Sequence, residues 1–178
     1  YGTAFDGASG DYVIPVDADD FMTLDALQIM ATYIEQNNWP ALLYSDEDKT
    51  NTASTVTSPF LKPDWDLLLF TNMCYVAHVC AIKRTLAIEM EAYKDHEARG
   101  CHDWDTFLRF LRSGYQPFHV PEILYSWRIH PGSTASRATG TKSYTVTSQY
   151  HVLSQHLRLT NLGYYFDIVE NNLFDNDG

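Results

Sequence analysis

Short apolar runs alternate with longer stretches of mixed character along the chain. Residues 11–16 (DYVIPV) and 41–45 (ALLYS) are apolar and rich in β-branched or aromatic side chains, which predicts two buried strands. Between them, from Leu24 to about Asn38, apolar residues recur every three or four positions, which is the period of a helix. Thr23 is the expected N-cap of that helix.

The same patterns predict the remaining elements. Residues 49–58 and 133–142 are polar and are predicted to be loops. Strands that alternate with helices favour an α/β layered fold. The length of 178 residues suits one domain with a sizeable core, which we place over residues 1–178. The other expected strands cover residues 75–82 and 118–125, and the other expected helices cover residues 84–92, 103–112 and 143–159.

Composition narrows the classes of function. Hydrophobic residues make up 45% of the chain, which is typical of a folded domain rather than a disordered one. The formal net charge of −11 argues against nucleic acid as a partner, because phosphate backbones are bound by clustered Lys and Arg. The same charge would repel an anionic small molecule unless a cation bridged the two.

The cysteine pattern indicates the redox state of the cellular compartment. Cys74, Cys80 and Cys101 form no CxxC pair, which favours a reducing compartment over a disulfide framework. No apolar run is long enough to span a bilayer, and no signal peptide is evident. We therefore expect a cytoplasmic protein, and leave open whether the full-length protein associates with a membrane.

The acids Asp17, Asp19 and Asp20 directly follow the first predicted strand. Ligands of open α/β sheets gather at the carboxyl ends of strands, and carboxylates there suit a hard divalent cation or a ribose hydroxyl. An acidic turn that precedes a helix explains the same residues equally well. A calcium-binding EF-hand is excluded, because Met22 and Gln28 stand where its loop needs Gly and Glu.

Two more acids, Asp103 and Asp105, lie where a predicted helix begins. The positive end of a helix dipole favours negative charge, and a carboxylate placed there can take a proton from a substrate hydroxyl. A capping Asp beside a buried Trp104 is the simpler explanation. Both interpretations stay open on these residues alone.

A third group follows the strand of residues 118–125. Arg128 can bind phosphate and His130 can bind a metal ion, although structural roles explain a lone Arg and a lone His as well. The polar residues 133–142 that follow resemble a lid over a site.

Five segments, in their order and spacing, resemble the inverting glycosyltransferases of family 2, which have the GT-A fold. The resemblance covers residues 8–136 and, more loosely, the last helix. It implies a Rossmann-like mixed sheet flanked by helices, and transfer of a sugar from a nucleotide-diphosphate sugar, most often a UDP-sugar, to a hydroxyl acceptor with inversion. The segments are ASGDYVIPVDADD, LLYSDEDK, PFLKPDWDLLL, HDWDTFLRFL and VPEILYSWRIHPGSTA.

The resemblance also implies roles for individual residues. Asp17 and Asp19 match the DXD motif, in which the first carboxylate contacts the ribose and the second holds Mg²⁺ or Mn²⁺ on the diphosphate. Asp103 matches the catalytic base that deprotonates the acceptor. Arg128 and His130 match the segment that closes over the diphosphate, with His130 as a further metal ligand.

Other matched residues have weaker implied roles. Trp65, Asp66 and Trp127 lie in segments that line the acceptor side in such enzymes, where aromatic faces suit sugar rings. Core packing explains each Trp equally well. Asp20 is expected to support the metal site or the helix start, and Asp105 to be structural.

The first βαβ unit of the family, which binds the nucleotide base, has no counterpart here. The resemblance therefore implies the C-terminal, metal- and acceptor-side part of a GT-A domain, with weak donor binding by this piece alone. The sheet edge that the unit would cover is expected to be open to pairing, so that a homodimer could form there. The alternative is a non-catalytic module that keeps the fold and binds a glycan or a partner.

Overall fold

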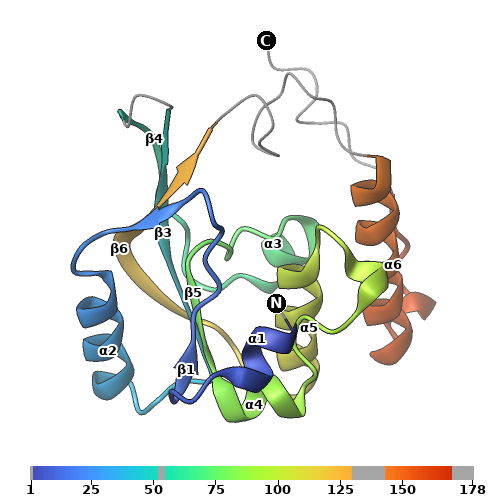
Figure 1. The fold of residues 1–178 in the computed structure, drawn as a ribbon. Helices are drawn as coiled ribbons and strands as arrows, with labels where there is room; N and C mark the ends of the chain where they lie inside the picture. Colours follow the sequence, from blue (N-terminus) through green and yellow to red (C-terminus); the bar gives the residue numbers. More distant parts are fainter. Residues whose placement is uncertain (1, 52–54, 130–142, 170–178) are drawn as a thin grey trace.

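The fold is built on one mixed β-sheet (Figure 1). The computed structural model describes residues 2–51, 55–129 and 143–169. Within them the sheet has the order β1-β5-β3-β6-β2, and β4 pairs with β3. β3 and β6 run parallel, and the other pairs are antiparallel. The strands are β1 (Tyr12–Val13), β2 (Phe21–Met22), β3 (Leu42–Thr50), β4 (Val56–Phe60), β5 (Cys80–Lys83) and β6 (Phe118–Arg128).

Helices cover both faces of this sheet (Figure 1). α2 packs on one face, while α3 and α5 lie on the other and α6 lies outside α5. α1 packs against α4 near the lower end of the sheet as drawn. The helices are α1 (Gly2–Gly7), α2 (Ala26–Gln36), α3 (Leu67–Asn72), α4 (Arg84–Glu89), α5 (His102–Arg112) and α6 (Ser143–Leu159), with short 3₁₀ turns η1 (His96–Ala98) and η3 (Leu162–Tyr164).

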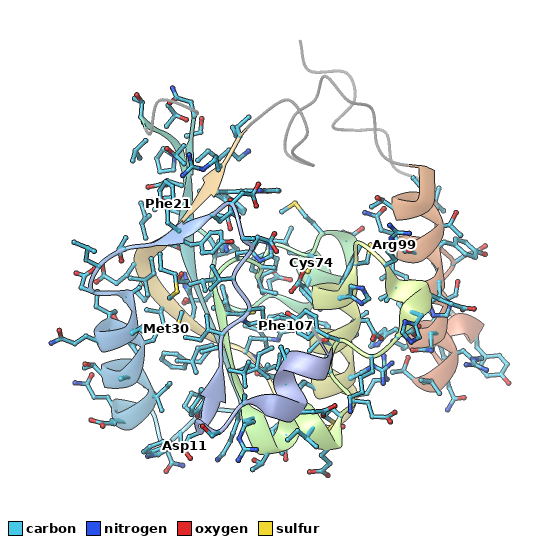
Figure 2. All side chains as sticks on the ribbon, in the orientation of Figure 1. Asp11, Phe21, Met30, Cys74, Arg99 and Phe107 are labelled. Atoms are coloured by element: carbon cyan, nitrogen blue, oxygen red, sulfur yellow. The ribbon has the colours of Figure 1, made fainter. Side chains whose placement is uncertain are left out.

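Two apolar cores fill the space between the sheet and these helices. Successive side chains of β3 point to opposite faces of the sheet, so this strand contributes to both cores. Leu43 belongs to the core that contains Met30 of α2, whereas Leu42 and Tyr44 belong to the core that contains Phe107 of α5. Figure 2 shows Met30 and Phe107 on opposite sides of the sheet. The predicted α/β fold, a mixed sheet flanked by helices, is thus confirmed.

The strand predicted over residues 11–16 is shorter than expected. Only its first part, β1, pairs with β5. Pro15 has no N–H to contribute to a ladder, which explains why the pairing stops. The chain then turns, with the Asp20 N–H donating to the Asp17 carbonyl at 3.2 Å, and forms β2 at the far side of the sheet beside β6.

The acids Asp46, Glu47 and Asp48 do not end the second predicted strand, as the sequence suggested, but continue it as β3. Their exposed fractions are 4%, 4% and 7%. Buried carboxylates are costly unless they are paired. Glu47 forms an ion pair with Lys62 at 3.0 Å, and Asp46 accepts the Lys62 N–H at 2.8 Å and lies 2.9 Å from His119 Nε2. The prediction was wrong because these partners lie far away along the chain.

Three further predictions change. The polar residues 49–58, expected to be a loop, include the end of β3 and the start of β4, which form a hairpin with an exposed outer strand. The strand expected over residues 75–82 begins only at Cys80. The strand expected over residues 118–125 continues through the full length of β6, and a register shift against β3 accommodates Pro121.

The predicted helices are confirmed with shifted ends. α2 begins after Asp25 rather than after Thr23, α4 ends at Glu89, and α5 and α6 match their expected ranges to within one residue. α3, which Asp66 caps, was not predicted. The predicted loop of residues 133–142 lies outside the described residues.

In the described part of the chain, β1 forms one edge of the sheet. Pairing of this edge with a second copy stays a prediction. Among the same residues, no helix combines the length and the apolar character needed to cross a bilayer.

The inner side of α6 carries a buried histidine, His156. His156 is 4% exposed, and its Nδ1 lies 3.5 Å from Arg112. Burial and the Arg112 guanidinium lower the pKa of His156 below its ordinary value. The unfolded chain therefore takes up this proton first as the pH falls below about 6.5, so His156 contributes stability above that pH and loses it as the pH falls further.

We expect His156→Gln to lose less stability than the wild type between about pH 7.5 and about pH 5.5, because its side chain has no proton to take up. Urea unfolding at several pH values measures this. His96→Gln, a substitution of an exposed histidine, is the matched control and should keep the wild-type pH dependence. The same pH dependence in His156→Gln as in the wild type would contradict the account.

Candidate active site

The acidic turn after β1 is fastened to the end of β6. Asp20 accepts hydrogen bonds from the Tyr125 hydroxyl at 2.6 Å and from the Arg128 backbone N–H at 2.8 Å. The Arg128 guanidinium donates to the Asp19 carbonyl at 2.8 Å and lies 4.9 Å from the Phe21 ring centroid. Asp20 and Arg128 therefore fix the shape of the turn.

The other two carboxylates of the turn are accessible. The Asp17 side chain is 40% exposed, with its Oδ2 3.9 Å from Nε2 of His78, and Asp19 is exposed. A hard cation such as Mg²⁺ needs only one or two protein carboxylates when substrate phosphates supply further oxygens, so Asp17 and Asp19 fit such an ion. No group of three potential ligand side chains gathers into a metal site within the described residues, and the predicted ligand His130 lies outside them.

A buried ion pair fixes the backbone beside this turn. The Lys62 side chain is fully buried, pairs with Glu47 at 3.0 Å and donates to the His78 carbonyl. Glu47 in turn accepts the His78 N–H at 2.8 Å. The pair thus holds both polar backbone groups of His78, whose ring packs against Tyr125 and Trp127.

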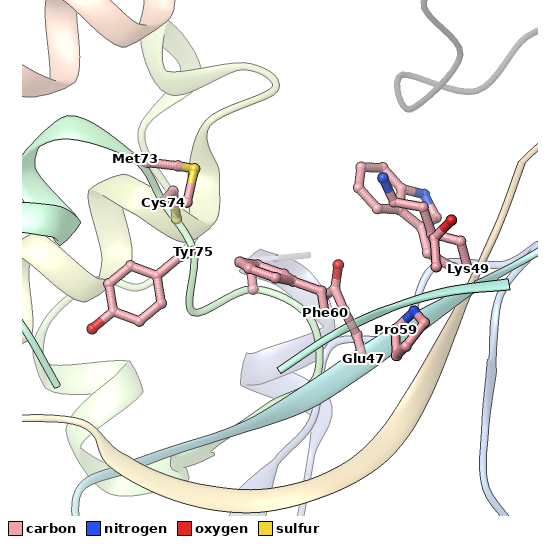
Figure 3. Close-up of a pocket in the computed structure, with 10 residues that line it drawn as sticks. Glu47, Lys49, Pro59, Phe60, Met73, Cys74 and Tyr75 are labelled. Atoms are coloured by element: carbon pink, nitrogen blue, oxygen red, sulfur yellow. The ribbon is translucent and has the colours of Figure 1, made fainter. Parts of the chain in front are cut away.

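A pocket of about 390 Å³ opens next to these rings (Figure 3). Cys74 and its neighbours form one wall, and β3 and β4 form the wall across from it. Trp127 and Phe60 supply aromatic surface, and the Lys49 Nζ lies 6.0 Å from the Trp127 ring centroid. This half-open pocket, with aromatic surface and a few polar side chains, has the size of a small-ligand site.

Asp103 lies in the first turn of α5. Its carboxylate accepts a hydrogen bond from the Tyr93 hydroxyl. Burial, followed by the Asp103 charge, raises the pKa of the Cys74 thiol, and Cys74 lines the pocket. Asp17 is linked to this pocket through His78, whose ring packs against the lining residue Trp127. Neither Asp103 nor an acid of the turn lines the pocket itself.

The predicted acceptor-side residues Trp65 and Asp66 make their contacts with other residues of the protein. Trp65 packs against the rings of Phe70 and Tyr75, and Asp66 accepts a backbone N–H of α3 at 2.9 Å. Of the three predicted acceptor-side residues, Trp127 lines the pocket.

Asp105 has a different environment from Asp103. It is 1% exposed and pairs with Arg109 at 2.8 Å. Burial raises the pKa of Asp105, and the Arg109 guanidinium opposes that shift. The side chain therefore has a structural ion-pair role inside the α5 core.

Sequence reasoning did not find His78, Tyr93, Tyr125 or Lys62. Tyr125 had a usable signal, because it lies two residues before Trp127 on one strand and so shares a face with it. Lys62, His78 and Tyr93 reach the site from other segments of the chain. No spacing in the sequence relates them to the acids that they contact.

Comparison with known proteins gives relatives that extend well beyond this chain. No protein-family model matches. The uncharacterized protein y4gI of Sinorhizobium fredii is 31% identical over 160 residues, 89% of this chain and 17% of that protein. The O-antigen biosynthesis protein RfbC of Myxococcus xanthus is 29% identical over 153 residues, 86% of this chain and 12% of RfbC. The chain thus spans less than a fifth of these relatives.

Solved structures share the fold. S. aureus TarS 1–349 in complex with UDP-GlcNAc superimposes with a TM-score of 0.60 at 13% identity, over 94% of this chain and 55% of that chain. The same protein in complex with UDP gives a TM-score of 0.56 at 14% identity, over 94% of this chain and 54% of that chain. The chain therefore has the fold of about half of TarS 1–349.

Proposed function

We propose that this chain is part of a glycosyltransferase that moves a sugar from a nucleotide-diphosphate sugar, in the first instance a UDP-sugar, to a hydroxyl acceptor with inversion. The observation that carries the proposal is the fold shared with TarS, together with the accessible carboxylates of the acidic turn, which lie beside His78 and Trp127. A protein of this fold binds UDP-GlcNAc, and a relative is named for O-antigen biosynthesis, which supports a nucleotide-sugar donor and a saccharide acceptor.

The acidic turn is the donor side of the proposed site. Asp19 would hold Mg²⁺ or Mn²⁺, which when bound neutralises the charge that develops on the leaving diphosphate. Asp17 would contact the ribose. Asp20 and the Arg128 guanidinium keep the turn in shape by their contacts with β6 and with the Asp19 carbonyl. Without a bound cation, this acidic chain would repel a diphosphate.

Asp103 is the proposed catalytic base. Its carboxylate would take the proton of the acceptor hydroxyl as that oxygen attacks the anomeric carbon, while the bond from this carbon to the diphosphate breaks. Attack from the face opposite the leaving group inverts the configuration. Its place in the first turn of an eleven-residue helix keeps the carboxylate at the positive end of a helix dipole.

The pocket is the proposed acceptor site, with Trp127 as a face for a sugar ring. We expect Trp127→Ala to raise the KM for the acceptor about 3–10-fold and to leave the KM for the donor within about twofold, because the ring contributes stacking rather than charge. Trp39→Ala, which removes a half-exposed Trp remote from the pocket, is the control. An unchanged acceptor KM in Trp127→Ala would remove this residue from the site.

We place this chain on the metal and acceptor side of the domain, with the base-binding half of the donor pocket supplied by residues outside it. The three cysteines of the chain are free thiols, which suits a cytoplasmic enzyme. UDP release from a panel of UDP-sugars, with a saccharide acceptor and with or without EDTA, tests the proposed function. Acceptor-dependent release that EDTA abolishes is the expected result, and no release with any donor would contradict it.

A further inference from the structure

The carboxylate of Asp103, the proposed base, accepts a hydrogen bond from the hydroxyl of Tyr93, which lies in a separate segment of the chain. We propose that Tyr93 is a positioning residue whose hydroxyl fixes one oxygen of the Asp103 carboxylate, so that the other oxygen is left to take the acceptor proton. The inference rests on the proposed function, since it assigns a partner to the base named there.

Tyr93 is docked onto α5 at two points. Its hydroxyl bonds to Asp103, and its backbone N–H donates to Oγ1 of Thr106 at 3.1 Å. Residues three apart lie on one face of a helix, so both contacts lie on the same side of α5. Tyr93 is 6% exposed and its ring stacks on Phe5 with centroids 5.1 Å apart. The ring therefore has little freedom to move the hydroxyl away from Asp103.

The backbone of Tyr93 is in an unfavourable conformation. Its φ of +59° lies in the left-handed region, which residues with a Cβ rarely adopt. Such outliers persist where surrounding contacts hold them, and they cluster at functional sites. Here the left-handed turn delivers the side chain to the start of α5, where its hydroxyl meets the carboxylate.

The hydroxyl acts as a donor throughout the working pH range. Burial and the neighbouring Asp103 charge raise the pKa of Tyr93 well above its ordinary value. The phenol therefore stays protonated and can donate to a carboxylate acceptor. The Cys80 thiol, the pKa of which is also raised by burial, interacts with the same hydroxyl and adds no charge to it.

Kinetics of Tyr93→Phe in the active full-length enzyme are the first test. We expect kcat to fall about 10–100-fold while both KM values stay within about twofold, because the carboxylate is misplaced but the substrates still bind. Tyr44→Phe is the matched control, since it also removes a buried hydroxyl that donates a hydrogen bond, there to the Pro63 carbonyl at 2.6 Å. A purely structural role would lower the melting temperature of both variants and spare kcat in both.

Energetic coupling between Tyr93 and Asp103 provides a second readout, which a change in stability alone would not affect. In the Asp103→Asn background, Tyr93→Phe should reduce residual turnover no further, because residues that act as a unit are not additive. Equal fractional losses in both backgrounds would overturn the inference. 3-Fluorotyrosine at position 93 tests the contact itself: its ¹⁹F resonance should shift in Asp103→Asn and stay in place in Asp25→Asn. A resonance that does not move in Asp103→Asn would overturn the inference.

These outcomes separate the inference from the proposed function. An active enzyme with an unchanged kcat in Tyr93→Phe overturns the inference alone. A protein without any transferase activity overturns both, even if the ¹⁹F signal confirms the contact between Tyr93 and Asp103.

Discussion

Asp103→Asn is expected to reduce kcat about 10²–10⁴-fold while the protein continues to bind a metal-dependent UDP donor. The amide has nearly the shape of the carboxylate and can still accept the Tyr93 hydrogen bond, but it cannot take up the acceptor proton. Asp103 lies at the start of α5, whereas the acidic turn is fastened to β6, so donor binding should change little. Steady-state kinetics and calorimetric titration of UDP with Mn²⁺ measure the two effects separately.

The matched control for this substitution is Asp25→Asn at the start of α2. Asp25 makes no side-chain capping bond and lies outside the site, so turnover should stay at the wild-type level. Equal turnover in Asp103→Asn and in the wild type would exclude Asp103 as the base. Loss of donor binding together with turnover would instead indicate that Asp103 supports the fold of the site.

Lys62→Met is expected to give the largest loss of stability, about 3–5 kcal/mol in the free energy of unfolding. The Lys62 side chain is fully buried, and its removal leaves Glu47 as an unpaired carboxylate in the core. It also removes the donor to the His78 carbonyl. Urea unfolding monitored by circular dichroism measures the loss.

Two comparisons make this result specific to the buried pair. Lys94→Met, which breaks the exposed pair with Asp6 at 3.2 Å, should cost at most about 1 kcal/mol. The double variant Glu47→Gln/Lys62→Met should recover part of the loss, because it leaves no buried charge unpaired. A loss in Lys62→Met no larger than in Lys94→Met would show that the ion pair is not needed for the fold.

The helices could be predicted from sequence because their signals are local. Apolar residues at helical spacing located α2, α5 and α6 to within a few residues. β3 could not be predicted in full, since three consecutive acids indicate a turn by every local rule. Asp46 and Glu47 are buried with Lys62 and His119 as partners, and these two residues lie 16 and 73 positions from Asp46 along the chain.

The candidate acids of the site could be identified from the sequence, but the residues that contact and orient those acids could not. The order of motifs identified Asp17, Asp19 and Asp103 as candidates. In the structure Asp17 lies beside His78 and Asp103 accepts a hydrogen bond from Tyr93, and none of the three acids lines the pocket. Tyr93 and His78 reach those acids through a left-handed turn and through a loop held by a buried ion pair. Neither arrangement has a sequence period, so only the three-dimensional structure reveals it.

The most direct test of the central claim is calorimetric titration of UDP, with and without Mn²⁺. It uses the 178-residue chain and a form extended N-terminally, each as wild type and as Asp17→Asn/Asp19→Asn. We predict that the extended wild type binds UDP only with Mn²⁺, and that the double variant does not bind. UDP binding that is indifferent to the metal or to the two aspartates would contradict the account. Failure of every form to bind UDP, GDP or dTDP would favour a module that binds a glycan or a partner instead.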